Sequence, residues 1–467
     1  MTITKKRKKK KLRKRRRVID SMAKKTTKKK TTKKAKKKKT KKVTKKDIEE
    51  DEDFIIDDEE EVQSIAEDTD IDDEEDSPEF ERKDQLTDVS KQILKKFGKG
   101  TVILASDNDS MDIARWSTGI MCLDHVLGGG RSEETGRMTY GLPRGFFTSF
   151  YGGESDGKTT TALITAGAVQ KSCRFCSTRI TKKNGCACGQ NVPCVVAWWD
   201  AEGCFDRDWA QRMGIDLRAL HLIRTKTAED GVDITRILLD SGEIDLLVID
   251  SIACLTPKAE MVEAMDKAMM GTAARLVNRA IRIWTGLLNK PERSYNQQPA
   301  IIMINQIRMK LGVMWGSPET RPGGRGQFYA EGIALRFGKG KYHFLNDDGS
   351  KEIAMSNAQD DDAPAWRDIK FTSTKNKTGT APRLSGIYHL HLDDRTWLEH
   401  DYRRGDRSEI EPLWGYGVKR GVIVKDGRLW RCGKLSSTTR DGLKQKLSGS
   451  PRARGRLKRE ILGKLLG

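Results

Sequence analysis

The chain of 467 residues carries 88 Lys and Arg against 67 Asp and Glu, a formal net charge of +21, and 36% of its residues are hydrophobic. This length leaves room for two or three domains, while the lack of an apolar run near the roughly 20 residues of a membrane span, or of an apolar signal segment, argues against membrane-spanning and secreted proteins. The basic excess favours a polyanionic partner, usually nucleic acid, over a charge balance kept only for solubility.

The first 82 residues differ in kind from the rest. Residues 1–46 hold 27 Lys or Arg and one acid, residues 47–81 hold 21 Asp or Glu and no Lys or Arg, and residues 82–467 keep a charge of +16. Such segments bury too little apolar surface to fold, so we expect a disordered tail over 1–82, basic over 1–46 and acidic over 47–81. Three readings of the tail stay open: tethering to phosphates, screening of the basic run by the acidic one, and a localisation signal within Lys6–Arg17.

Order is expected to begin near residue 83. Thr87 can cap a helix whose apolar residues recur at helical spacing up to Phe97 and which Gly98 and Gly100 end. A strand is expected over 101–104, so residues 83–116 form a small helix and strand segment.

Between residues 117 and 393, short β-rich runs alternate with helical patterns. The runs are Gly145–Tyr151, Cys194–Trp199, Asp245–Asp250 and Ala300–Asn305. This alternation predicts an α/β core with a mostly parallel central sheet flanked by helices. Residues 394–467 show shorter segments and a basic end, which predicts a small separate α/β domain that ends in a helix over Arg456–Leu466.

A glycine-rich segment, Gly152-Gly-Glu-Ser-Asp-Gly-Lys-Thr159, fits the phosphate-loop pattern G-x-x-x-x-G-K-[ST] at every fixed position. It follows an apolar strand and precedes a helix expected over Thr159–Val169, where backbone N–H groups and the helix dipole can hold phosphates. Lys158 would contact the β- and γ-phosphates and Thr159 would bind Mg²⁺. The expected ATP-binding residues are Gly152, Gly153, Glu154, Ser155, Asp156, Gly157, Lys158, Thr159 and Thr160; the alternative is a chance glycine-rich turn.

Two carboxylates suit hydrolysis of the bound ATP. Asp250 closes a run of four aliphatic residues, and there it would hold Mg²⁺ together with Thr159. Glu202 follows the preceding predicted strand and is the candidate for orienting or deprotonating water. An ordinary solvated loop carboxylate is the alternative for Glu202.

Four cysteines lie close together between the glycine-rich segment and the next strand. Cys173-x-x-Cys176 and Cys186-x-Cys188 provide four soft ligands, and Gly185 and Gly189 provide turns. This pattern predicts a structural Zn²⁺ site in an insertion over 171–193, with Cys194 as a substitute ligand and free thiols or a redox pair as alternatives. Basic residues decorate the insertion: Lys171, Arg174, Arg179, Lys182 and Lys183. Nine cysteines without a secretory signal indicate a reducing compartment. The protein is therefore expected to be cytoplasmic, and nucleoid-associated if its host has no nucleus.

Several longer segments resemble the bacterial RecA recombinase family over roughly residues 84–385. They are Thr256-Pro-Lys-Ala-Glu260, Met270-Gly-Thr-Ala-Ala-Arg275, Ile304-Asn-Gln-Ile-Arg-Met-Lys310 and Gly312-Val-Met-Trp-Gly-Ser-Pro-Glu-Thr320, with shorter matches at 97–100, 110–112, 117–119, 323–324 and 328–329. The resemblance implies a RecA-like P-loop NTPase core, a role in oligomerisation for residues 83–116, and helical filaments of the chain on DNA.

The resemblance also implies roles for residues of the ATP site. Glu202 matches the catalytic carboxylate, while Asp206 and Trp209 match positions that contact adenine. Gln306 matches the glutamine that senses the γ-phosphate. Lys375 and Lys377 match the pair that reaches the ATP of the neighbouring subunit.

Two DNA-binding loops are implied over about 260–271 and 307–324. Arg275, Asn278, Arg282, Arg308, Gly323 and Gly324 match DNA-contacting positions, and Met270 and Leu311 match apolar wedges between bases, for which core packing is the alternative. Contacts to the DNA backbone suit a protein that binds DNA of any base sequence. Gln327 departs from the family, where a lysine usually makes a subunit contact.

The implied function is ATP-dependent pairing and strand exchange between single-stranded and double-stranded DNA, with DNA-dependent ATP hydrolysis. A RadA-like or replicative helicase and a DNA-coating protein that barely hydrolyses ATP are the alternatives. RadA carries its four-cysteine module before the core and has a Lys-Asn-Arg-Phe-Gly signature that is missing here.

Overall fold

The computed structural model describes residues 87–97, 113–131, 138–262, 271–290, 293, 297–310, 318–346, 352–358, 363–378, 384–397 and 400–466. The chain divides into two units, 1–81 and 82–467, and every described residue belongs to the second. The predictions for the tail, for the strand at 101–104 and for Met270 and Leu311 therefore lie outside the described residues. The helix expected from Thr87 is present as α2 (Thr87–Phe97).

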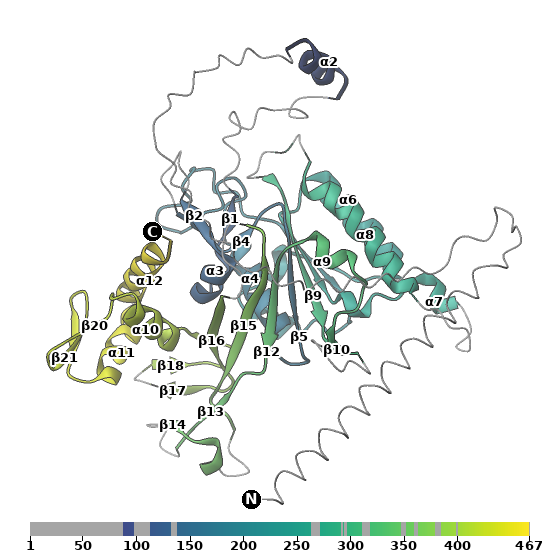
Figure 1. Cartoon of the computed structure of the whole chain (residues 1–467). Coiled ribbons are helices and arrows are strands. Elements are labelled where there is room, and N and C mark those ends of the chain that lie inside the picture. Colours follow the sequence, from purple (N-terminus) through teal and green to yellow (C-terminus); the bar gives the residue numbers. More distant parts are fainter. Residues whose placement is uncertain are drawn as a thin grey trace, which may run out of the picture. The chain divides into compact units, whose positions relative to one another are not determined.

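A central sheet organises the second unit (Figure 1). Among the described residues it has eleven strands in the order β14-β13-β15-β12-β5-β9-β8-β6-β7, with β16 paired to β15 and β19 paired to β16. The strands from β12 to β7 pair in parallel, and the others add an antiparallel edge. The bounds are β5 (Phe147–Gly152), β6 (Val196–Asp200), β7 (Leu220–Ile223), β8 (Leu246–Asp250), β9 (Ala300–Gln306), β12 (Glu331–Gly338), β13 (Tyr342–Leu345), β14 (Glu352–Ile353), β15 (Trp366–Asn376), β16 (Ser385–His391) and β19 (Arg407–Ser408).

The predicted α/β core with a mostly parallel sheet is confirmed. The four runs expected to be strands are β5, β9, β8 and β6, adjacent in the sheet and each within two residues of the expected bounds. The long apolar runs arise because a parallel strand covered on both faces is buried throughout.

Alternate residues of the central strands β6, β8 and β9 enter two hydrophobic cores. In β6, Val196 and Trp198 enter one core while Ala197 and Trp199 enter the other, as the period of two in a strand requires. The first core also receives residues of α3 (Met121–Leu127), α4 (Lys158–Val169) and α5 (Arg207–Arg212). The second receives residues of α6 (Ala228–Ser241) and α8 (Thr272–Leu288), which lie side by side in Figure 1.

Smaller elements lie outside the central sheet. They are β1 (Arg115–Trp116) paired with β4 (Leu142–Pro143), β2 (Gly129–Arg131) with β3 (Met138–Tyr140), β10 (Arg308–Met309) with β11 (Glu319–Thr320), and β17 (Arg395–Trp397) with β18 (His400–Tyr402). The short helices are η3 (Leu217–Ala219), η4 (Ile252–Cys254), α7 (Lys258–Val262), α9 (Gly326–Ala330) and η6 (Met355–Asn357).

The C-terminal region has a hydrophobic core of its own. It contains α10 (Ile410–Lys419), β20 (Val424–Asp426), β21 (Leu429–Cys432), β22 (Leu435–Ser437), α11 (Arg440–Ser448) and α12 (Pro451–Leu466). Its core joins residues of these helices to Met121 of α3, so it also packs on the larger core, and the domain boundary at 394 stays a prediction. The helix expected over Arg456–Leu466 is present and begins earlier, at Pro451. Within the described ranges, every helix is too short or too polar to cross a membrane.

Gly231 tests the packing of α6 against the sheet, and Gly286 of α8 is the control. A Cβ on Gly231 of α6 would lie 1.8 Å from Cζ2 of Trp199, whereas a Cβ on Gly286 of α8 would meet no atom within 4 Å. Gly231→Ala should therefore lower the free energy of unfolding by about 1–3 kcal/mol or more through overpacking. Gly286→Ala should raise it by up to about 1 kcal/mol, because alanine is the better helix former. Urea unfolding followed by tryptophan fluorescence measures both; equal effects of the two substitutions would contradict this packing.

Candidate active site

The glycine-rich loop leaves the N-terminus of α4 open. Gly157 precedes the helix with a φ of 89°, and neither a side-chain cap nor an acidic residue of the first turn occupies the helix N-terminus. A Cβ on Gly157 would also lie 2.7 Å from Cδ1 of Ile369, so both the backbone angle and the neighbour require glycine here. The first N–H groups of α4 are therefore free to bind an anion.

Charged side chains fold into the loop itself. Asp156 Oδ2 accepts a hydrogen bond of 2.8 Å from the amide of Gly153, and Lys158 Nζ donates to the carbonyl of Gly153. Burial lowers the pKa of Lys158, against the opposing charges of Asp156 and Asp250. The Lys158 ammonium thus lies inside the loop, where a triphosphate can replace the loop carbonyl as its partner. Glu154, Ser155 and Thr159 are exposed at the same loop.

Three parallel strands bring the other polar groups to the edge of the loop. Glu202 follows β6, Ser251 follows β8 and Gln306 ends β9. Glu202 Oε1 accepts hydrogen bonds from Ser251 Oγ at 2.7 Å and from Gln306 Nε2 at 3.1 Å. The structure therefore brings Glu202 and Gln306, two of the residues to which the family resemblance assigns roles in the ATP site, into direct contact. Sequence reasoning missed Ser251, for which the only signal was its place directly after Asp250.

Asp250 is suited to be a ligand of a cation. Burial, followed by the nearby charge of Glu202, raises the pKa of Asp250 to about 7, although a hydrogen bond with Thr159 opposes the shift. Its Oδ1 atom is buried and has no hydrogen-bond partner among the described residues. A buried carboxylate oxygen without a partner, beside the Thr159 hydroxyl, is a donor set that suits Mg²⁺.

The two expected adenine contacts lie on α5. Asp206 caps this helix, with Oδ1 accepting from the Trp209 amide at 3.0 Å. Trp209 Nε1 donates to Thr160 Oγ1 at 3.3 Å. The indole is therefore held beside the first turn of α4, while Asp206 has a structural role as a cap that explains its position without a ligand.

Lys375 and Lys377 lie away from the phosphate loop of their own subunit. Lys375 pairs in register with Ala334, and Ala334 with Ser149, so Lys375 is level with the middle of β5, whereas the loop begins at Gly152. Three residues along a strand correspond to about 10 Å, in addition to the intervening strand β12. Lys375 Nζ donates to the carbonyl of Phe328, and Lys377 Nζ to that of Tyr329 at 3.2 Å.

The expected DNA-contacting residues lie on α8 and around the second loop. Arg275, Asn278 and Arg282 follow one face of α8, and the two arginines are exposed. Asn278 Oδ1 accepts from the Gly326 amide at 3.0 Å, so it also holds the start of α9. Arg308 is exposed on β10, and the pairing of β10 with β11 makes the base of the loop a hairpin. Gly323 and Gly324 have φ of 96° and 79° where the loop ends.

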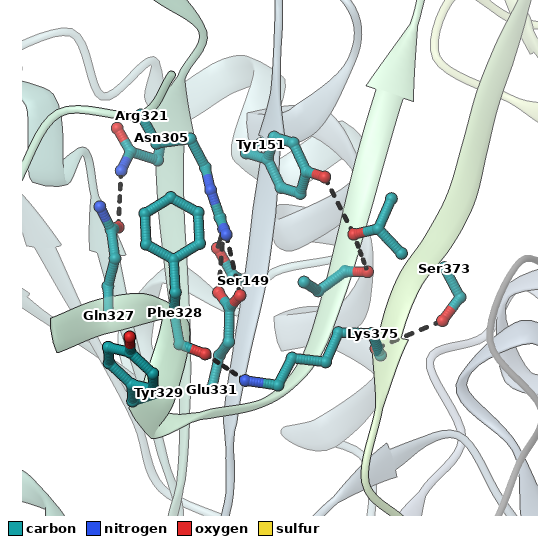
Figure 2. A network of polar contacts seen from close by, with 12 residues as sticks. Ser149, Tyr151, Asn305, Arg321, Gln327, Phe328, Tyr329, Glu331, Ser373 and Lys375 are labelled. Atoms are coloured by element: carbon teal, nitrogen blue, oxygen red, sulfur yellow. Dashed lines mark hydrogen bonds and ion pairs between the residues drawn. The ribbon is translucent and has the colours of Figure 1, made fainter. Parts of the chain in front are cut away.

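A buried polar network anchors the end of this loop to the sheet (Figure 2). Gln327 is fully buried, and its side chain bonds Asn305 at 2.9 Å and the carbonyls of Pro322 and Gly324 within its own subunit. Arg321 forms a bidentate pair with Glu331 at 2.8 and 2.9 Å. In Figure 2, Arg321 passes between Phe328 and Tyr151, with its guanidinium carbon 4.0 and 4.2 Å from the two ring centroids.

This network was not visible in the sequence. Arg321 and Glu331 are 8% and 1% exposed, which is rare for charged residues, and nothing in their spacing distinguishes them from solvated loop charges. Both partners are satisfied by each other, so the loss of either would leave a buried charge unpaired.

The four cysteines of the insertion converge. The Sγ atoms of Cys173, Cys176, Cys186 and Cys188 all lie within 4.8 Å of one another, and the Cys186 to Cys188 distance is 3.5 Å. Cys194 lies in the hydrophobic core and is not among these four. The site fits a tetrahedral ion in the way that four thiolates bind zinc.

Not all basic residues of the insertion face solvent freely. Arg174 donates to the carbonyl of Gly242 at 2.8 Å and its Nε lies 3.6 Å from Oδ2 of Asp245, and Lys171 donates to the carbonyl of Gly214. These contacts dock the insertion on the core. Arg179, Lys182 and Lys183 are exposed.

Comparison with known proteins agrees with this geometry. The RecA N-terminal domain family matches residues 84–343. The Protein RecA sequences of Staphylococcus aureus strains JH9, Newman and Mu3 are each 38% identical over 386 residues, which cover 82% of this chain and 93% of each relative. The chain therefore belongs to the RecA family.

Proposed function

We propose that the chain is an ATP-dependent recombinase that assembles on single-stranded DNA, pairs it with homologous duplex DNA and exchanges strands. The observation that carries this proposal is the hydrogen bond between Glu202 and Gln306. It joins the candidate catalytic carboxylate of the ATP site to the residue from which the second DNA loop begins. Family membership supports the same function.

The residues of the ATP site would bind the nucleotide, orient the attacking water and hold Mg²⁺. The open N-terminus of α4 and Lys158 bind the β- and γ-phosphates, and Trp209 stacks on the adenine. Glu202 orients the water that attacks the γ-phosphate and takes its proton. Asp250 and Thr159 would hold Mg²⁺, which supplies charge neutralisation on the phosphates when it is bound.

The hydrogen bond between Gln306 and Glu202 would also couple the ATP site to the DNA-binding loop. An attacking water beside Glu202 would compete for the carboxylate oxygen that accepts from Gln306, and a γ-phosphate oxygen would compete with that carboxylate for the Gln306 amide, so nucleotide binding changes the partner of Gln306. Gln306 ends β9, and the hairpin β10–β11 begins two residues later. A movement of Gln306 would therefore move Arg308 as well. The rest of the surface that binds the single DNA strand would contact the DNA backbone without preference for base sequence. It would consist of Arg275, Asn278, Arg282, Gly323 and Gly324.

Lys375 and Lys377 would complete the ATP site of the next subunit in a filament. Their distance from the loop of their own subunit supports this assignment, since cations that act at an interface make hydrolysis depend on assembly. Figure 2 shows Lys375 directed toward the carbonyl of Phe328, beside the buried Arg321–Glu331 pair. The lysines therefore rest on α9, which follows the second DNA loop.

We further propose that Cys173, Cys176, Cys186 and Cys188 bind a structural Zn²⁺. The mutual distances of their four Sγ atoms support this. The ion would fix the insertion, whose exposed Arg179, Lys182 and Lys183 then face solvent as a basic surface for DNA. Association of the protein with the nucleoid in the cytoplasm follows from this DNA-binding role.

Substitutions in the phosphate loop and at Glu202 test the function. Lys158→Ala and Glu202→Ala should each lower single-strand-dependent ATP turnover by about 100-fold or more, because one removes phosphate binding and the other the general base, and both should abolish strand exchange. The exposed Glu243→Ala serves as the matched carboxylate control and should keep both activities. Turnover and exchange are measured on homologous substrates. Exchange that survives both substitutions would contradict the proposal, and fork unwinding without exchange would favour a helicase.

Mixed filaments test whether the lysines act across the interface. Lys158→Ala subunits keep Lys375 and Lys377, and Lys375→Ala/Lys377→Ala subunits keep the phosphate loop, so each variant alone should be inactive. In a random equal mixture about a quarter of the interfaces combine an intact loop with intact lysines, because the contact is head-to-tail. ATP turnover should therefore recover to about that fraction of the wild-type rate. Sedimentation with DNA verifies that both variants enter the filament; a mixture that does so and stays inactive would contradict the assignment.

A further inference from the structure

A second group of metal-ligating side chains lies outside the ATP site and the cysteine insertion. His343 of β13, Asp368 of β15 and His389 of β16 each contribute one ligand atom, and these atoms lie within 4.8 Å of one another. His343 Nε2 and His389 Nδ1 are 2.8 and 2.9 Å from the same atom, Oδ1 of Asp368. The three side chains are 17%, 6% and 10% exposed.

The register of the sheet produces this convergence. Asp368 pairs with His389 directly across the β15–β16 ladder, and Trp366, two residues earlier on the same face, pairs with His343 on β13. The ring of Trp366 stacks on that of His343 at 5.3 Å and 13°, which fixes the imidazole plane. The ligands therefore come from three hydrogen-bonded strands rather than from loops, and such a site is held rigidly.

A neighbouring carboxylate sets the orientation of the first imidazole. Glu352 Oε1 lies 2.6 Å from Nδ1 of His343. A metal-binding histidine almost always donates its other ring N–H to such a group, which leaves the remaining nitrogen free to bind the ion. The cation Lys370 lies 3.8 Å from Oδ2 of Asp368 and is 40% exposed, so it leaves Oδ1 to the imidazoles.

We propose that His343, Asp368 and His389 bind a divalent transition-metal ion of the zinc type, with Glu352 as a positioning residue for His343. Two imidazole nitrogens and one carboxylate oxygen suit Zn²⁺, Co²⁺ or Ni²⁺ better than Mg²⁺ or Ca²⁺, which prefer oxygen ligands. Zinc with three protein ligands keeps its fourth position for water.

The ion would tie the β13–β14 hairpin to the strands that border the phosphate loop. Arg367 and Ile369, on either side of Asp368, approach that loop: Arg367 lies 3.8 Å from Asp156, and Ile369 is the neighbour that excludes a Cβ at Gly157. The site therefore stabilises the strand that supports the phosphate loop, without contact with the reacting atoms. The proposal is independent of the recombinase function.

The full-length protein, stripped with a chelator and reloaded with Zn²⁺, tests the proposal by metal counting. The wild type should retain about two ions per chain, one in each site. Cys186→Ser/Cys188→Ser should lose the thiolate ion and keep the other, and His343→Gln/His389→Gln should show the reverse. His221→Gln changes an exposed histidine on β7 and is the matched control. A cysteine variant that retains no ion, or a histidine variant that loses none, would overturn the proposal.

X-ray absorption at the zinc edge provides a second measurement that does not depend on the folding of any variant. In the reloaded wild type, the proposal requires a nitrogen and oxygen shell at about 2.0–2.1 Å, with imidazole scattering, beside the sulfur shell at about 2.3 Å. A shell of sulfur alone would show that His343, Asp368 and His389 form only a hydrogen-bonded triad.

Discussion

The hydrogen bond from Gln306 to Glu202 is the contact on which the arrangement of the site depends. It forms because β6, β8 and β9 are parallel neighbours, so that their carboxyl ends meet at one edge of the sheet beside the phosphate loop. Ser251 binds the same oxygen of Glu202 from the intervening strand. A single carboxylate oxygen thus links the place where ATP would be hydrolysed to the start of the proposed second DNA loop, so a new partner at Glu202 would release Gln306.

The second end of the same loop is anchored through different chemistry. Asn305, the neighbour of Gln306, bonds Gln327 of α9, and the buried Arg321–Glu331 pair joins the loop end to β12. The carbonyls of α9 in turn hold Lys375 and Lys377. In a filament this continuity would connect the nucleotide of one subunit to the site that its lysines complete in the next. The antiparallel edge beyond β12 supports the phosphate loop, against which Arg367 and Ile369 lie.

Features with a local or periodic signal could be predicted from the sequence. The phosphate loop is contiguous, and strands buried on both faces are apolar runs, so β5, β6, β8 and β9 were placed to within two residues. The four cysteines lie within sixteen positions of one another, and their convergence followed from spacing. Glu202 and Gln306 are 104 positions apart. Glu202 was a candidate because it follows a predicted strand, Gln306 was found only through the resemblance to RecA, and their contact was not predicted.

Features made by tertiary contact could not be predicted in this way. Arg321 and Glu331 look like solvated loop charges until burial is known, and His343, Asp368 and His389 meet only because β15 pairs with both β13 and β16. Arg174 was expected to decorate the surface of the insertion, yet it docks the insertion on Asp245 and the carbonyl of Gly242. In each case the partner is set by strand register or by the fold of a distant segment, which no spacing rule encodes.

The Gln306–Glu202 contact is expected to transmit the nucleotide state to the second DNA loop. Amide hydrogen exchange over residues 307–324, with and without a non-hydrolysable ATP analogue, tests it most directly. The analogue should change amide exchange in this segment of the wild type and leave it unchanged in Gln306→Ala, although the variant still binds the analogue. An equal nucleotide-dependent change in the variant would show that the Gln306–Glu202 contact does not transmit the nucleotide state.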